Sequence, residues 1–92
     1  MNKKELIERL LVLPKEIEAA EKRVLDAIRA VDGAKQEASK WIKHTSTNAY
    51  HARVLAEAEI RRDVVKANHN RLMNEFRALQ TVAQLLAEED TL

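Results

Sequence analysis

Cysteine is absent from this 92-residue sequence, and glycine and proline occur once each. Without cysteine the chain cannot form a disulfide framework, a thiolate zinc site or a cysteine nucleophile. A β-protein of this length needs several turns rich in glycine, proline or asparagine, and such segments are missing. No apolar run approaches the roughly 20 residues of a membrane-spanning helix. The apolar stretch Leu6 to Leu13 is interrupted by Glu8 and Arg9, unlike a signal peptide, so we expect a cytoplasmic protein that does not enter a membrane.

The abundant residue types favour long helices. Hydrophobic residues make up 46% of the chain, which is normal for a folded protein and argues against disorder. Alanine, leucine, valine and isoleucine supply most of this fraction, because tryptophan, tyrosine and phenylalanine occur once each. Glutamate, lysine and arginine supply most of the charge. This composition, with few helix-breaking residues, predicts a single all-α domain over residues 1–92.

The first half of the sequence carries a seven-residue repeat of apolar residues. Their spacing alternates between four and three, which places them on one side of a helix over about five heptads. The repeat predicts a helix over about residues 3–43, and its alanine-rich middle allows a partner helix to approach closely. This seam consists of Leu6, Leu10, Leu13, Ile17, Ala20, Val24, Ala27, Val31, Ala34, Ala38 and Trp41.

Two residues interrupt the helix-favouring sequence of this half. Pro14 lacks a backbone N–H and clashes with the preceding turn, which costs about 3 kcal/mol inside a helix. It therefore either kinks one long helix or starts a second helix after a short first one. The apolar phase continues across Pro14, which favours a kink or a very tight break. Gly33 follows Asp32 and is compatible with a turn, but the seam keeps its phase there as well.

The clearest break lies at His44-Thr45-Ser46-Thr47-Asn48. Short polar residues favour turns and helix N-caps, so we predict a loop over residues 44–47 and a second helix over about residues 48–88. Arms of equal length joined by so short a loop favour an antiparallel hairpin. The main apolar face of the second helix consists of Tyr50, Val54, Ala58, Val65, Leu72, Phe76, Leu79, Ala83 and Leu86.

A second, weaker apolar stripe on the later helix has no partner within a hairpin. It holds Ala49, Ala56, Ile60, Val64 and Ala67, and one facing helix cannot cover it together with the main face. The residues expected to mediate self-association are Ala56, Ile60, Val64 and Ala67. A core made from one pair of helices is also thin. We therefore predict self-association, most simply as a homodimer. The expected fold is an all-α, coiled-coil-like antiparallel hairpin, kinked or broken near Pro14, that dimerises into a four-helix arrangement.

Residues with chemical potential do not form a recognisable catalytic or metal site. On one helix, His51 and His69 would lie about 27 Å apart, too far to share an ion within one chain. The sequence has no His-x-x-x-His pair, glycine-rich phosphate loop or nucleophile elbow. Acidic residues such as Glu57 and Glu59 have the pattern of solvated helix charges. We therefore predict a non-enzymatic protein without catalytic residues, metal or cofactor.

The predicted hairpin tip is the most distinctive candidate for binding a partner. No acidic residue occurs from Ala38 to Ala56. Positive charge beside aromatic rings suits the phosphates and bases of a nucleic acid, and equally an acidic protein surface. The alternative is structural, with Trp41 and Tyr50 closing the end of the hydrophobic seam. The candidate partner-binding residues are Lys40, Trp41, Lys43, His44, Tyr50, His51 and Arg53.

Several segments of the sequence share residues with one group of small helical proteins. The first runs from Leu6 to Leu13 and on through Pro14-Lys15-Glu16-Ile17-Glu18-Ala19-Ala20-Glu21. The others are Asn48-Ala49 through Arg53, Asn74-Glu75-Phe76-Arg77-Ala78-Leu79 and Leu85-Leu86-Ala87. These segments resemble small helical proteins encoded by bacteriophages and prophages of Gram-positive bacteria. The resemblance implies a protein that binds and modulates host or phage nucleic-acid machinery, but it carries over no site residues, and Trp41 to Thr47 departs from the more acidic connecting segments of that group.

Three functions follow as hypotheses. The main one is an adaptor or inhibitor that binds a protein of replication, recombination or defence. The second is a nucleic-acid-binding module that uses the basic tip. The third is a structural or assembly coiled coil.

Overall fold

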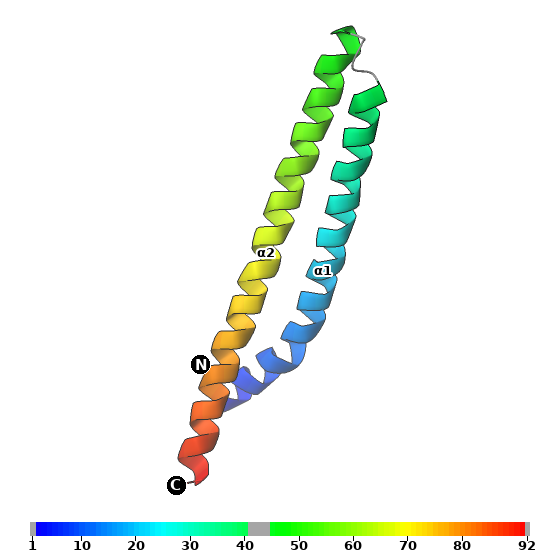
Figure 1. Cartoon of the computed structure of the whole chain (residues 1–92). Helices are drawn as coiled ribbons and strands as arrows, with labels where there is room; N and C mark the ends of the chain where they lie inside the picture. The colour runs from blue at the N-terminus through cyan, green and yellow to red at the C-terminus, as the bar shows by residue number, and fades with distance from the viewer. Residues whose placement is uncertain (1, 41–44, 92) are drawn as a thin grey trace.

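The computed structural model describes residues 2–40 and 45–91, which form two long helices (Figure 1). Helix α1 spans Lys3–Lys40 and helix α2 spans Thr45–Thr91. The two helices run antiparallel along a molecule of 71 × 15 × 14 Å, and the described residues contain no strand. These findings confirm the predicted all-α class and agree with a two-helix hairpin.

The helix bounds differ from the predicted ones around the tip. Helix α2 begins at Thr45, so residues 45–47 are helical and not part of a loop. Backbone N–H groups in the first turn of a helix have no intrahelical acceptor, so short polar residues are well tolerated there. Helix α2 also continues to Thr91 and has 47 residues against 38 in α1, so the arms are unequal. The predicted end of the first helix at residue 43 lies outside the described residues.

Helix α1 is capped at its start by Asn2. The Asn2 Oδ1 accepts a hydrogen bond from the Glu5 N–H at 2.8 Å. The Asn2 carbonyl oxygen accepts one from the Leu6 N–H at 3.0 Å, which begins the helical pattern. The side-chain bond satisfies one of the N–H groups that every helix start leaves without an intrahelical partner.

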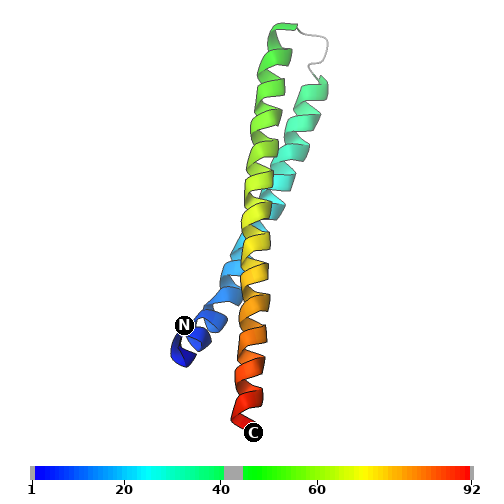
Figure 2. The ribbon, with the colours of Figure 1, turned by 90° about the vertical axis from the view of Figure 1, so that its left-hand side faces the viewer.

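Helix α1 continues through both residues that were expected to disturb it. Pro14 lies inside the helix, so the alternative in which a helix ends there does not hold. Gly33 is helical without a positive φ, so Asp32-Gly33 is not a turn. The first turns of α1, drawn blue, nevertheless run in a different direction from the rest of the helix (Figure 2).

The hydrophobic core lies where the seam of α1 meets the main apolar face of α2. Leu13, Ala20 and Leu72 are buried together, and Ile17, Phe76 and Leu79 pack against them. Towards the tip the buried seam continues with Ala27 and Val31. All seam residues from Leu6 to Ala38 are buried or half-buried, which confirms the predicted repeat, and Trp41 lies outside the described residues. On α2 the predicted face from Val54 to Leu86 is likewise buried or half-buried.

Candidate protein-interaction surfaces

The residues predicted to mediate self-association lie on the surface of α2. Ala56, Ile60, Val64 and Ala67 recur at helical spacing and therefore share one face. Ile60 is 64% exposed and Val64 is 62% exposed, and both alanines are exposed as well. We call these four residues the α2 stripe. Exposed apolar side chains that gather on one face are typical of contact surfaces, and helix α1 leaves this one uncovered.

The two described cations of the predicted tip both have acidic neighbours. The Lys40 Nζ lies 3.1 Å from a carboxylate oxygen of Glu37, and the Arg53 Nε lies 3.1 Å from one of Glu57. These exposed ion pairs reduce the positive charge that a phosphate group would meet, although all four side chains remain largely accessible. The other predicted tip residues lie outside the described residues: Trp41, Lys43 and His44.

Tyr50 is more exposed than its position on the main apolar face of α2 predicted. Its side chain is 64% exposed, and its ring meets the half-buried His51 edge to face, with centroids 5.3 Å apart and an interplanar angle of 75°. A groove beside it is lined on α1 by Ala30, Gly33, Ala34 and Glu37. The interpretation that Tyr50 closes the end of the seam is therefore wrong. The ring lies at the surface.

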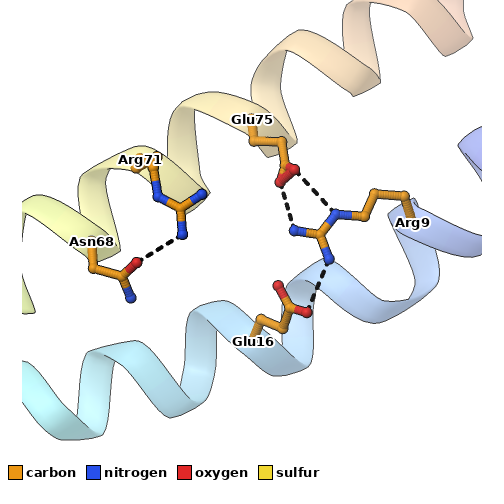
Figure 3. Close-up of polar contacts among 5 residues, drawn as sticks. All are labelled: Arg9, Glu16, Asn68, Arg71 and Glu75. Carbon is orange, nitrogen blue, oxygen red and sulfur yellow. Dashed lines mark hydrogen bonds and ion pairs between the residues drawn. The ribbon is translucent and has the colours of Figure 1, made fainter. Parts of the chain in front are cut away.

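Arg9 joins α1 to α2 through a cluster of charged groups (Figure 3). Its Nε and Nη2 donate to the two carboxylate oxygens of Glu75 at 3.1 and 2.7 Å. Its Nη1 donates to Glu16 on α1 at 2.9 Å. A fork-to-fork pair of this kind is the strongest form of charge-assisted hydrogen bond between side chains, because both bonds align at once. The first turns of α1 are thus tied to α2 and to the residues that follow Pro14.

The electrostatics of this cluster favour the charged forms of both partners. The hydrogen bonds from Arg9 lower the pKa of Glu75 below its ordinary value of 4.5, against an opposing effect of partial desolvation. The same bonds to Glu75, and next the bond to Glu16, raise the pKa of Arg9 above its ordinary value. Arg71, which donates to Asn68 at 2.9 Å, contributes further positive potential at Glu75. Sequence reasoning missed this cluster, although an arginine inside the apolar stretch from Leu6 to Leu13 was a usable signal.

A second uncovered apolar surface lies at the open end of the hairpin. Ile7 and Leu11 in the first turns of α1 are 57% and 70% exposed. A shallow groove nearby runs between the first turns of α1 and the last turns of α2, and Leu6, Ile7, Ala83 and Leu86 are among the residues that line it. The unbroken apolar run Leu10 to Leu13 was the sequence signal for this surface, because no single helix face can bury four consecutive residues.

Neither a metal centre nor a membrane span emerges from the described part of the chain. Among residues 2–40 and 45–91, no three His, Asp or Glu side chains come close enough together to hold an ion. Within the same residues, neither helix has a stretch that is both long enough and apolar enough to span a lipid bilayer.

Comparison with known proteins gave no match, whether with protein-family models, with curated proteins or with solved structures. The class of protein is therefore described by its fold and surfaces, as a long two-helix hairpin with an uncovered apolar stripe.

Proposed function

We propose that this chain is a non-enzymatic helical hairpin that binds other proteins in the cytoplasm. Its role would be that of a phage- or prophage-type adaptor or inhibitor of replication, recombination or defence machinery. The observation that supports protein binding is the α2 stripe, in which Ile60 and Val64 are more than half exposed. Full burial of an exposed aliphatic side chain contributes about 1.5–3 kcal/mol, and Ile60 and Val64 would contribute in proportion to the surface that they still expose. The phage context is supported only by the resemblance in sequence.

The first partner that we propose is a second copy of the chain, in a homodimer with a four-helix core. A cross-section of 15 × 14 Å leaves room for little apolar burial between two helices. Pairing the α2 stripes of two copies would move Ile60 and Val64 from the surface into a thicker core. Exposed alanines at Ala56 and Ala67 would allow the two α2 helices to approach closely.

We also infer that Pro14 causes the change in direction of α1. Proline has no N–H to donate to the carbonyl of Leu10, and its ring crowds that carbonyl. The 2.9 Å ion pair between Arg9 and Glu16 spans the proline and would hold the bend. Residual dipolar couplings of a Pro14→Ala variant should report a straighter helix, whereas an unchanged angle would assign the bend to packing.

Sedimentation equilibrium tests self-association. We expect the wild type to be dimeric at micromolar concentration and the double variant Ile60→Asp, Val64→Asp to be a folded monomer. Leu25→Asp is the matched control, because Leu25 is a 49% exposed apolar residue of the other helix. A folded wild-type monomer at these concentrations would reject the dimer.

Binding to another protein requires a separate experiment. Affinity capture from cells would supply candidates, and each purified candidate would then be titrated with wild type and with the Ile60→Asp, Val64→Asp variant. The proposal expects at least one candidate of replication, recombination or defence to bind the wild type with micromolar or tighter affinity and the variant more weakly. If no purified candidate binds, the adaptor function fails.

The alternative is a nucleic-acid-binding module, and the observation that favours it is the exposed ring of Tyr50 near the tip. An accessible aromatic ring with neighbouring cations can stack a base while the cations contact phosphates. Titration of labelled single- and double-stranded DNA over a range of salt concentrations separates this function from the first. Salt-sensitive binding that is lost when Lys40, Lys43 and Arg53 are changed to Glu would support the module. Absence of binding at low salt would reject it.

A further inference from the structure

Four charged residues of α2 are placed symmetrically about Val64. Glu57 and Arg71 lie seven positions on either side of it, and Arg53 and Glu75 lie eleven positions on either side. Seven and eleven positions are close to two and three turns of an α-helix, so the four residues project on the same side of α2 as Val64. We call these five residues the Val64 face.

The charges of the Val64 face change sign when the helix is reversed. From the start of α2 the order is positive, negative, apolar, positive and negative. Reading the same face from the other end gives the opposite sign at every charged position. A helix with this pattern is complementary to a second copy of itself that runs in the opposite direction, but not to a parallel copy in the same register.

Building on the proposed self-association, we infer that a second copy of this chain docks on the Val64 face with its α2 antiparallel to the first and the two-fold axis near Val64. Each Arg53 then lies opposite Glu75 of the second copy, and each Glu57 lies opposite Arg71 of the second copy. A parallel dimer would instead place every charged residue opposite its own equivalent. Both contacts are isologous, so a single two-fold operation generates them twice and closes the assembly.

The exposure of the face fits this use. The side chains of Arg53 and Glu57 are 80% and 64% exposed, and Val64 is 62% exposed. Arg71 is exposed, while the Glu75 carboxylate is about one third exposed and is held in place by Arg9 from α1. All five residues thus keep a surface for a partner. Both oxygens of the Glu75 carboxylate already accept from Arg9, and Arg53 already pairs with Glu57, so the contacts with a second copy would add to these bonds.

Affinity and orientation come from different residues of this contact. Burial of Val64 and Ile60 supplies the affinity, because apolar area removed from water is the main driving force of association. Near the axis, Ile60 lies close to Ala67 of the second copy, so that a large side chain meets a small one. Exposed ion pairs add little affinity, but like charges placed opposite one another disfavour the wrong orientation. Binding of a partner with a different sequence would not require charges that invert about Val64. Antiparallel pairing of two copies requires this inversion, so the pattern favours a second copy.

Charge reversal tests the orientation. Glu57→Arg alone and Arg71→Glu alone each create two like-charge contacts in the antiparallel dimer, and we expect each to raise the dimer Kd about tenfold or more. Combining the two changes restores opposite charges and should return the Kd to within about threefold of the wild type. Glu21→Arg and Arg77→Glu are the matched controls, because both residues are exposed and lie outside the Val64 face. Neither control, alone or combined, should change the Kd.

Sedimentation equilibrium gives the Kd of each variant, and circular dichroism verifies that each remains helical. The antiparallel register is overturned if the single reversals leave the Kd unchanged, or if the double variant has a Kd as high as the single variants. In either case a dimeric wild type would still support self-association. A wild type that sediments as a monomer overturns both the register and the dimer.

Cysteine pairing provides an independent measurement, because the chain has no cysteine of its own. When the Glu57→Cys and Arg71→Cys variants are mixed and mildly oxidised, the antiparallel dimer brings the two different positions together, and the mixed disulfide should predominate. A disulfide needs Cα atoms within about 7 Å, so distant positions do not react. Predominance of disulfides between identical variants would indicate a parallel dimer and overturn the inference.

Discussion

Leu13 and Leu11 lie two positions apart on α1 but in opposite environments. Leu13 has no exposed surface and belongs to the core cluster with Ala20 and Leu72, whereas Leu11 is 70% exposed. Two positions correspond to about 200° around a helix, so two residues of the same type point in nearly opposite directions. The contribution of each leucine to stability is therefore decided by its place on the helix and not by its chemistry.

We predict that Leu13→Ala lowers the free energy of unfolding by about 2–5 kcal/mol, because it removes buried apolar surface and leaves a cavity. Leu11→Ala is the matched control and should change it by less than about 0.5 kcal/mol in monomeric protein. Urea unfolding followed by circular dichroism measures both. Equal losses in the two variants would contradict the observed placement of the core.

Gly33 is helical and exposed, and a Cβ added at this position meets no atom within 4 Å. Alanine loses less backbone entropy than glycine when a helix forms. Gly33→Ala should therefore raise the free energy of unfolding by about 1 kcal/mol in thermal or urea melts. Ala30→Gly, at an exposed position one turn earlier, should lower it by a similar amount. A destabilised Gly33→Ala variant would show that residue 33 is not part of a free helical surface.

Helix α1 and helix α2 are held together differently along their length. Near the middle the contact is apolar and narrow, with Ala20, Ala27 and Val31 buried. At the first turns of α1, Arg9 adds a polar tie through its two hydrogen bonds to Glu75. These first turns run in a different direction from the rest of α1, and the bonds from Arg9 to Glu75 connect them to α2 (Figure 3).

The tie between Arg9 and Glu75 should make stability depend on pH. The pKa of Glu75 in the folded chain is lowered from 4.5, so the folded state binds the proton less readily than the unfolded state. Its contribution is therefore complete above the ordinary pKa and is lost as the pH falls through the lower folded-state pKa. We expect Glu75→Gln to lower the melting temperature at neutral pH and to match the wild type in strong acid.

Thermal melts of wild type and Glu75→Gln across the acid range measure this difference. Glu21→Gln serves as the control for removing an exposed carboxylate from the chain. A difference between wild type and Glu75→Gln that persists unchanged into strong acid would mean that the glutamate acts through packing and not through its charge.

The whole molecule is a thin rod in which few side chains can be far from solvent. Its cross-section is 15 × 14 Å over a length of 71 Å. Within the described residues, the buried hydrophobic side chains are Leu6, Leu13, Ala20, Ala27, Val31 and Leu72. The α2 stripe and the apolar residues of the open end remain outside this core. Stability at the scale of the molecule is therefore expected to depend on association.

If the chain dimerises, its melting temperature should rise with protein concentration, because dissociation accompanies unfolding. The variant Ile60→Asp, Val64→Asp should melt at a lower temperature that does not depend on concentration. Differential scanning calorimetry over a hundredfold range of about micromolar to submillimolar protein measures this dependence. A concentration-independent melt of the wild type would contradict the dimer.

The positions of the helices and their facing sides followed from the sequence because they depend on local spacing. The repeat from Leu6 to Ala38 identified the buried side of α1. The polar residues 44–48 predicted a break between the helices, and the described helices end at Lys40 and begin at Thr45. The end of a helix is less predictable, because threonine and serine suit both a loop and a first turn. Helix α2 accordingly includes residues 45–47.

Contacts between residues far apart in the chain required the tertiary structure. Arg9 and Glu75 are separated by 66 positions, and their meeting depends on the direction of the first turns of α1 and on the alignment of the two helices. Tyr50 belongs to the apolar phase of α2, yet its side chain is 64% exposed and lines a groove with Gly33 and Ala34 of α1. Periodicity along one helix specifies which side is apolar, but only the packed pair specifies what each side chain meets.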